Sequence, residues 1–156
     1  MRISGSLIGV RVLEVVLGGL FVYAGLQKYL HAYEFAEAVL AYQLLPGSLV
    51  GVTAAALPWV EITAGLGLVV GLKRRSCLII LAWLLAGFLV VIFITMARGL
   101  NIDCGCGLFM QRQVGVGVVA EDAVLLFWAA GLYWWERRLV GLARPTFFGG
   151  KPKTEG

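Results

Sequence analysis

Charged side chains are scarce in this chain. Only 14% of its residues are Asp, Glu, Lys or Arg, whereas about a quarter are charged in an average soluble domain. Hydrophobic residues make up 60% of the sequence, and the mean hydropathy is +0.90. This composition excludes a soluble globular domain and predicts an integral membrane protein of one domain. The formal net charge of +4 does not indicate nucleic-acid binding, because the basic residues gather at the ends of apolar segments.

Four apolar segments are each long enough to cross about 30 Å of hydrocarbon as a helix. Their Leu, Val, Ala and Gly residues do not alternate with polar ones, which favours helices over barrel strands. Residues 31–45 are amphipathic and too short to span, so we expect them to form a helix in the outer interface. The sequence therefore predicts an all-α, four-helix membrane bundle over residues 1–140, followed by a flexible, basic cytoplasmic tail over 141–156. The expected spans cover about residues 7–26, 49–72, 77–97 and 114–135.

The basic residues are distributed unequally between the two sides of such a bundle. Ten lie near the chain ends or in the second loop, and only Lys28, Arg98 and Arg112 fall on the other side. Cytoplasmic loops are enriched in Lys and Arg, so both termini are expected in the cytoplasm. The first and third loops then face outward, which in the inner membrane of a bacterium means the periplasm. On the inner side, Arg11 and Glu14 are three residues apart and are expected to pair with each other.

The third loop carries a closely spaced thiol pair, Cys104-Gly105-Cys106. In the oxidising periplasm such a pair can form a strained disulfide, which is easily reduced. Arg112 and the start of the fourth span would stabilise a thiolate, whereas Asp103 opposes it. We therefore interpret Cys104 and Cys106 as a redox-active pair. The alternative is a permanent disulfide that only shapes the loop.

Histidine and cysteine are too few for a zinc site at this loop. Two outward thiolates and the single His31 leave at least one ligand missing, and the usual Cys-x-x-Cys spacing is absent. The third cysteine, Cys77, lies at the inner start of the third span and is interpreted as a small buried apolar residue. One thiol pair needs an outside electron donor or acceptor, such as a quinone or a thioredoxin-like domain on another chain.

Several polar side chains lie within or beside the spans. Glu61 is well inside the second span, where a carboxylate is costly, so it is a candidate functional residue, held neutral or paired with a basic residue of another helix. Gln27 and Lys28 end the first span at the outer face, where the lysine can extend to water. Both can also line a site beside the cysteine loop. Of the adjacent acids Glu121 and Asp122, at most one is expected to face the bundle interior.

Four short motifs, in the same order along the chain, resemble those of the DoxX-like MauE family. They are F-x-x-A-G-x-x-K at residues 21–28, Y-x-L-L-P at 42–46, L-P-W-x-E at 57–61 and the Cys-Gly-Cys loop at 104–107. The resemblance covers about residues 10–135. It implies a small four-helix membrane protein linked to disulfide or sulfur redox chemistry. Founding members of that family serve the maturation of a periplasmic methylamine dehydrogenase, and relatives occur beside, or fused to, thioredoxin-like domains.

Three functions remain open at this stage. The first is a thiol–disulfide oxidoreductase that exchanges with a periplasmic thioredoxin-like or disulfide-containing partner. The second is a non-catalytic assembly factor or membrane anchor, and the third is a small carrier or channel that uses Glu61 and the acids of the fourth span. The arrangement is also similar to that of the DsbB and vitamin K epoxide reductase group. By analogy of fold alone, a quinone would bind near Trp59, Glu61 and Lys28.

Overall fold

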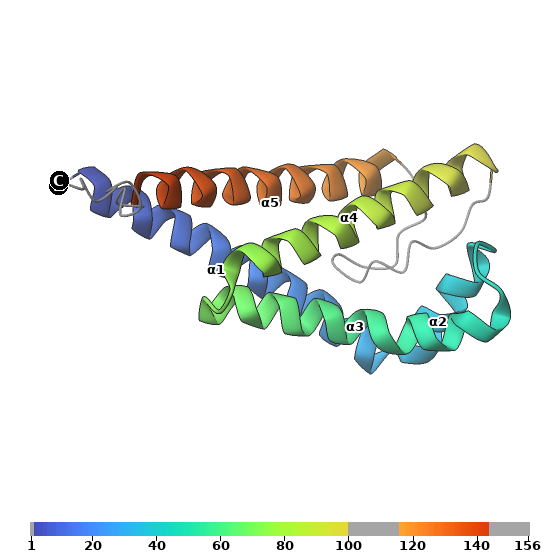
Figure 1. The fold of residues 1–156 in the computed structure, drawn as a ribbon. Coiled ribbons are helices and arrows are strands. Elements are labelled where there is room, and N and C mark those ends of the chain that lie inside the picture. The colour runs from blue at the N-terminus through green and yellow to red at the C-terminus, as the bar shows by residue number, and fades with distance from the viewer. Residues whose placement is uncertain (1, 100–115, 144–156) are drawn as a thin grey trace, which may run out of the picture.

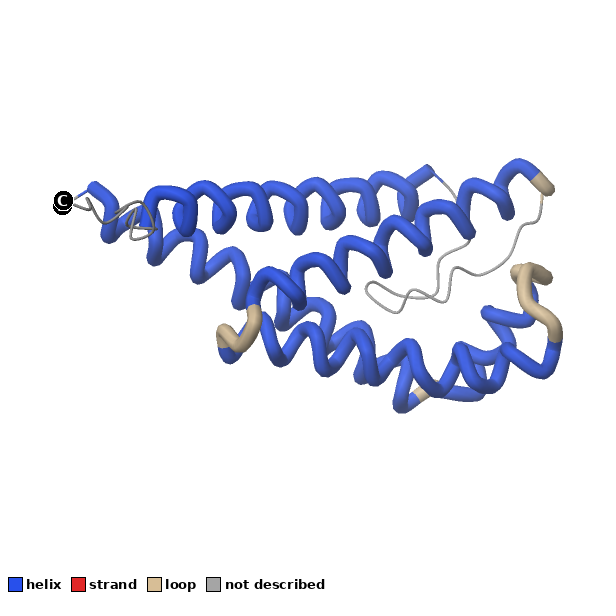
Figure 2. Tube along the Cα trace, viewed as in Figure 1, coloured by secondary structure: helices blue, strands red, loops and turns tan. Residues whose placement is uncertain are grey.

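The computed structural model of the protein describes residues 2–99 and 116–143, and the side chains within 8–99 and 117–138. Within these residues there is no strand, and four of the helices are long and apolar enough to cross a membrane. Short turns connect the first four helices of the chain to one another (Figure 2). The expected all-α membrane bundle with a short helix after the first span is therefore confirmed. The helices are α1 (Arg2–Leu30), α2 (Ala32–Ala41), α3 (Gly47–Val70), α4 (Arg74–Ala97) and α5 (Val116–Ala143).

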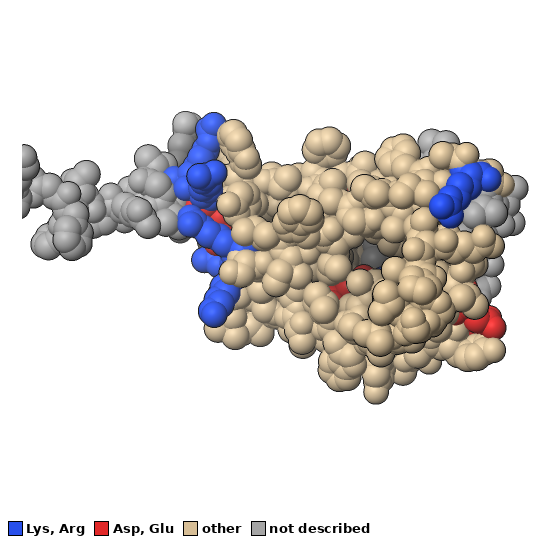
Figure 3. Space-filling view, turned by 45° about the vertical axis from the view of Figure 1, so that its right-hand side comes forward, with Lys and Arg blue, Asp and Glu red and all other residues tan. Residues whose placement is uncertain are grey.

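The four long helices form two pairs, with α1 along α3 and α4 along α5 (Figure 1). The amino end of α1 and the carboxyl end of α5 lie at one end of the bundle, together with the turn between α3 and α4 (Figure 1). We call this the basic end, because Lys73, Arg74, Arg75, Arg137 and Arg138 belong to it. The short α2 lies at the opposite end, the α2 end. Between the two ends the flank is almost free of charge, as Figure 3 shows.

Glycines bring α1 and α3 into close contact. A Cβ on Gly18 would lie 2.7 Å from the carbonyl oxygen of Gly65, and a Cβ on Gly65 would lie equally close to that of Gly18. Two turns further along α1, a Cβ on Gly25 would lie 2.9 Å from the carbonyl oxygen of Pro58. Small residues at such positions let helix backbones approach in a membrane, where apolar side chains gain little by leaving lipid. The contact fixes the register of α1 against α3.

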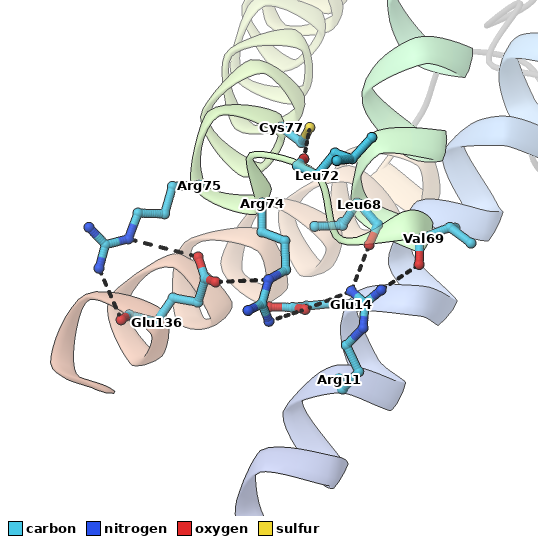
Figure 4. Close-up of polar contacts among 9 residues, drawn as sticks. All are labelled: Arg11, Glu14, Leu68, Val69, Leu72, Arg74, Arg75, Cys77 and Glu136. Carbon is cyan, nitrogen blue, oxygen red and sulfur yellow. Dashed lines mark hydrogen bonds and ion pairs between the residues drawn. The ribbon is translucent and has the colours of Figure 1, made fainter. Parts of the chain in front are cut away.

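The turn between α3 and α4 reverses the chain in three residues. Gly71 has φ 90° and donates its backbone N–H to the carbonyl oxygen of Gly67, which closes the end of α3. Arg11 of α1 donates to the carbonyl oxygens of Leu68 and Val69 in the last turn of α3, where a helix leaves its carbonyl groups without partners of its own (Figure 4). A side chain from the neighbouring helix therefore satisfies the end of α3.

Apolar side chains form the core nearer the basic end. Leu17, Leu68, Leu78 and Leu81 are fully buried, so all three of α1, α3 and α4 contribute to it. Many large apolar residues on the outer faces are exposed instead, with Trp83 and Phe127 among the most exposed. Burial inside and apolar exposure outside are what lipid-facing helices require.

Candidate functional site

A buried ion pair joins α1 to α3 in the membrane. The Nζ atom of Lys28 lies 2.8 Å from each carboxylate oxygen of Glu61. The side chains are only 7% and 9% exposed. Gly25 makes this possible, because its missing side chain lets α1 approach α3 at Pro58 and Glu61. Of the two states expected for Glu61, the structure shows the one paired with a basic residue of another helix. Lys28 does not extend to water, which corrects that expectation.

A cavity of about 390 Å³ lies beside this ion pair, between the two helix pairs. Its walls come from all five helices and are mostly apolar. On the flank of the molecule, Figure 3 shows a hollow with acidic side chains inside it. The aromatic residues that line the cavity are Phe21, Phe35, Tyr42, Trp83 and Phe88.

Two acids of α5 border the same cavity. Glu121 and Asp122 both line it, so the expectation that at most one faces the interior was wrong. The cavity is wide enough for neighbouring positions on one helix to reach it. Asp122 is 8% exposed, and its Oδ2 atom has no hydrogen-bond partner among the described residues. Nothing in the sequence of α5 alone distinguishes Asp122 from a lipid-facing position, because its burial depends on how the helix pairs face each other.

Tyr42 closes the cavity at the α2 end. It follows α2 and packs in a small buried cluster with Ile92 of α4 and Val118 of α5. Burial, and to a lesser degree the nearby charge of Asp122, raise the pKa of the Tyr42 phenol to about 12. The phenol is therefore neutral at physiological pH. Sequence analysis placed Tyr42 in a family motif but not in a site.

The other predicted site residues of the described segments do not reach the cavity. Trp59 is 55% exposed and makes an edge-on contact with Tyr29, with ring centroids 5.5 Å apart. Gln27 donates a hydrogen bond of 2.9 Å to the hydroxyl of Tyr23 on the helix surface. The structure thus brings Lys28 and Glu61 together and leaves Trp59 and Gln27 outside. The remaining predicted residues, Cys104, Cys106, Asp103 and Arg112, lie outside the described part of the chain.

A second group of charges ties three helices together at the basic end (Figure 4). Glu14, which is fully buried, lies 3.2 Å from Arg11 and 3.2 Å from Arg74. Arg74 also lies 3.3 Å from Glu136 of α5, and Arg75 lies 3.9 Å from it. The expected pair of Arg11 and Glu14 is confirmed. Its extension to α4 and α5 was missed, because spacing along one helix cannot reveal partners on another.

Cys77 lies close to this network but takes no part in it. Its thiol is buried and donates to the carbonyl oxygen of Leu72 at 3.5 Å. It packs at Gly67, where a Cβ would lie 2.6 Å from its sulfur. The interpretation of Cys77 as a small buried residue is confirmed.

Comparisons with known proteins connect this arrangement to one family. The family model described as methylamine utilisation protein MauE matches residues 7–135. The chain is similar to the methylamine utilization protein MauE of Methylorubrum extorquens, with 33% identity over 71% of this chain and 61% of the relative. It is similar to the protein of the same name from Paracoccus denitrificans, with 38% identity over 60% of this chain and 51% of the relative.

The MauE of Methylophilus methylotrophus is 37% identical over 53% of this chain and 44% of its own length. The chain thus spans about half the length of the curated relatives it matches. No solved structure gives a significant match. Because the family model covers all four spans and the turns between them, this chain is a member of the MauE family of membrane proteins.

Proposed function

We propose that this protein is an accessory membrane component for the maturation of a periplasmic enzyme, and that it acts by thiol–disulfide exchange through Cys104 and Cys106. The name of the curated relatives, methylamine utilization protein, supports an accessory role of this kind. The observation that carries the proposal is the path of the chain. The segment with both cysteines begins after Ala97 of α4 and ends before Val116 of α5. Both helix ends lie at the end of the bundle that carries α2 (Figure 1).

We further propose that the basic end is cytoplasmic and that the α2 end faces the periplasm of a bacterial inner membrane. Most Lys and Arg side chains of the described residues gather at the basic end, and few lie elsewhere (Figure 3). Cytoplasmic loops carry such an excess. Single cysteines at Lys73 and at Gln43, in a variant without native cysteines, test this orientation. We expect a membrane-impermeant maleimide to label the Gln43 position in intact spheroplasts and the Lys73 position only after lysis. The reverse pattern would refute the orientation.

The proposed exchange takes place in two steps. A thiolate of the pair attacks a disulfide sulfur of the periplasmic partner, which forms a mixed disulfide and releases a partner thiolate. The second cysteine of the pair then attacks its own bridged neighbour and releases the second partner thiolate. Two electrons and two protons thereby pass to the partner, and the pair becomes a disulfide. The reverse sequence oxidises the partner, and the relative reduction potentials decide the direction.

A quinone, which the fold analogy names as an electron acceptor, would have to fit the cavity. Its carbonyl oxygens need hydrogen-bond donors. Among the described residues that line the cavity, Tyr42 and Thr53 carry hydroxyl groups. The charged groups there are one ammonium, already bound by both oxygens of Glu61, and the carboxyl groups of Glu61, Glu121 and Asp122. This mostly acceptor set fits a carbonyl ligand poorly. No step of the proposed function therefore runs through a quinone.

Trapping the mixed disulfide tests the proposed function. In Cys106→Ser, Cys104 can still form the mixed disulfide, but no second thiol is left to release the partner. We therefore expect a covalent adduct with a periplasmic protein, which a reductant cleaves. Cys77→Ser is the matched control, and it should form no adduct and keep full activity. If neither Cys104→Ser nor Cys106→Ser yields an adduct, and both still support maturation of the periplasmic enzyme, the redox function is wrong. The protein would then be a non-catalytic assembly factor.

A further inference from the structure

One of the charged groups at the cavity lacks a partner among the described residues. Of those residues that line the cavity, Lys28 is the one cation, and Asp122 has a carboxylate oxygen that accepts no hydrogen bond. The ammonium is fully engaged by Glu61, at 2.8 Å from both of its oxygens. Ionised carboxylates away from water are costly unless a cation or hydrogen bonds compensate them. The α5 side of the cavity therefore favours a second cation.

Asp122 is the acid that most needs such a partner. It is more than nine-tenths buried, and among the described residues its Oδ2 atom accepts no hydrogen bond. Lys28 is the one cation among the described residues that line the cavity, and its ammonium group is hydrogen-bonded to Glu61 instead. A bare metal ion is a poor occupant. No group of three His, Cys, Asp or Glu in the described segments is placed to hold one.

The walls indicate what kind of cation fits. Cavities that bind small molecules measure about 300–1,000 Å³, and this one, at about 390 Å³, is large enough for an organic body. Phe35, Tyr42, Trp83 and Phe88 line it, and the faces of aromatic rings attract cations. Lys28 already uses this attraction, since its Nζ lies 5.8 Å from the centre of the Phe35 ring.

We propose that the cavity binds an organic cation, a protonated amine on an apolar body, with its ammonium group at Asp122 and its body among the aromatic walls. The hollow with acidic side chains lies on the apolar flank, which faces the lipid (Figure 3). An anionic ligand would face Asp122, and the one ammonium group that the described residues bring to the cavity is already paired with Glu61. A neutral ligand would leave Asp122 unpaired. The proposal is independent of the thiol pair and of its redox activity.

Three small molecules with the same phenyl body test the charge selectivity. 2-Phenylethylamine is a cation at neutral pH, 2-phenylethanol is neutral, and 3-phenylpropionate is an anion. Isothermal titration of the full chain in detergent, corrected with empty micelles, gives their affinities. We expect saturable binding of the amine, about tenfold or more tighter than of the other two. Equal affinities, tighter binding of the alcohol or the anion, or no saturable binding of the amine would each overturn the proposal.

Substitutions at Asp122 locate the site. Asp122→Asn removes the charge with little change in shape and should weaken amine binding about tenfold or more, whereas Asp122→Glu should retain it. Glu34→Gln is the matched control, because Glu34 is an exposed acid of α2 that does not line the cavity. If a correctly folded Asp122→Asn binds the amine like the unchanged protein, the proposal fails. If that variant does not fold, Asp122→Glu and the three-ligand series decide.

Discussion

Breaking the ion pair of Lys28 and Glu61 should destabilise the bundle strongly. At 2.8 Å the two charges attract each other by about 6 kcal/mol for an effective dielectric constant of about 20. Desolvation of both groups offsets most of this gain in the intact pair. Removing one partner leaves the other charge buried and uncompensated, which costs about 3–5 kcal/mol. A loss of this size reduces the folding equilibrium constant by a factor of at least about a hundred.

The two single substitutions should differ in size. Glu61→Gln leaves Lys28 at a cavity that the carboxyl group of Asp122 also lines. Lys28→Met instead leaves Glu61 and Asp122 at one cavity without a cation from the described residues, so it should be the more damaging change. The double variant removes both charges and should be less destabilised than the sum of the single variants, by at least about 2 kcal/mol.

Reversible unfolding in mixed micelles, followed by circular dichroism, measures these free energies. Glu34→Gln, at an exposed position, serves as the control and should change stability by less than about 0.5 kcal/mol. Single losses below about 1 kcal/mol, or a double variant that equals the sum of the two, would show that the pair does not hold α1 on α3.

Three further predictions concern other parts of the bundle. Gly18→Ala should lower the unfolding free energy by about 1–3 kcal/mol, because the added Cβ would lie 2.7 Å from a backbone oxygen of α3. Gly19→Ala is the control and should not lower it, because a Cβ there would have no neighbour within 4 Å. Equal losses in the two variants would contradict the close contact of α1 and α3. Glu14→Gln should lower the unfolding free energy by about 1–3 kcal/mol, because Arg11 and Arg74 lose a buried ionic partner. An unchanged unfolding midpoint in mixed micelles would contradict this prediction. The phenol of Tyr42 should ionise only near pH 12 rather than 10, so its stabilising contribution is complete below pH 10 and is lost towards pH 12. Absorbance at 295 nm, with Tyr42→Phe for comparison, measures this, and a normal titration of all tyrosines would refute it.

Apolar length alone was enough to predict the membrane helices. The third expected span, 77–97, ends at the same residue as α4, Ala97. The errors lie where charged residues continue a helix. α1 extends to Leu30 rather than to residue 26, because Lys28 is buried against Glu61 and does not mark the edge of the membrane. α4 begins at Arg74, whose charge meets Glu14 and Glu136 rather than water alone.

The candidate site was only partly predictable. Glu61 stood out because an acid inside a span is unusual, and the family motifs marked both Lys28 and Glu61. Their contact depends on the register of α1 against α3, which Gly18 and Gly65 set through space and not through sequence spacing. The burial of Asp122 depends on how the α4–α5 pair faces the other pair. No single-helix pattern contains that information.

The charges at the basic end also set an order of assembly. Arg74 and Arg75 emerge from the ribosome well before Glu136, and in the orientation that we propose their charges would then hold the turn after α3 on the cytoplasmic side. Glu14 can meet Arg74 once α1, α3 and the start of α4 are inserted. The link to Glu136 forms only after α5 has crossed the membrane. In the proposed orientation, the same arginines would act first as a topology signal and later as the ion-pair partners that join α4 to α1 and α5.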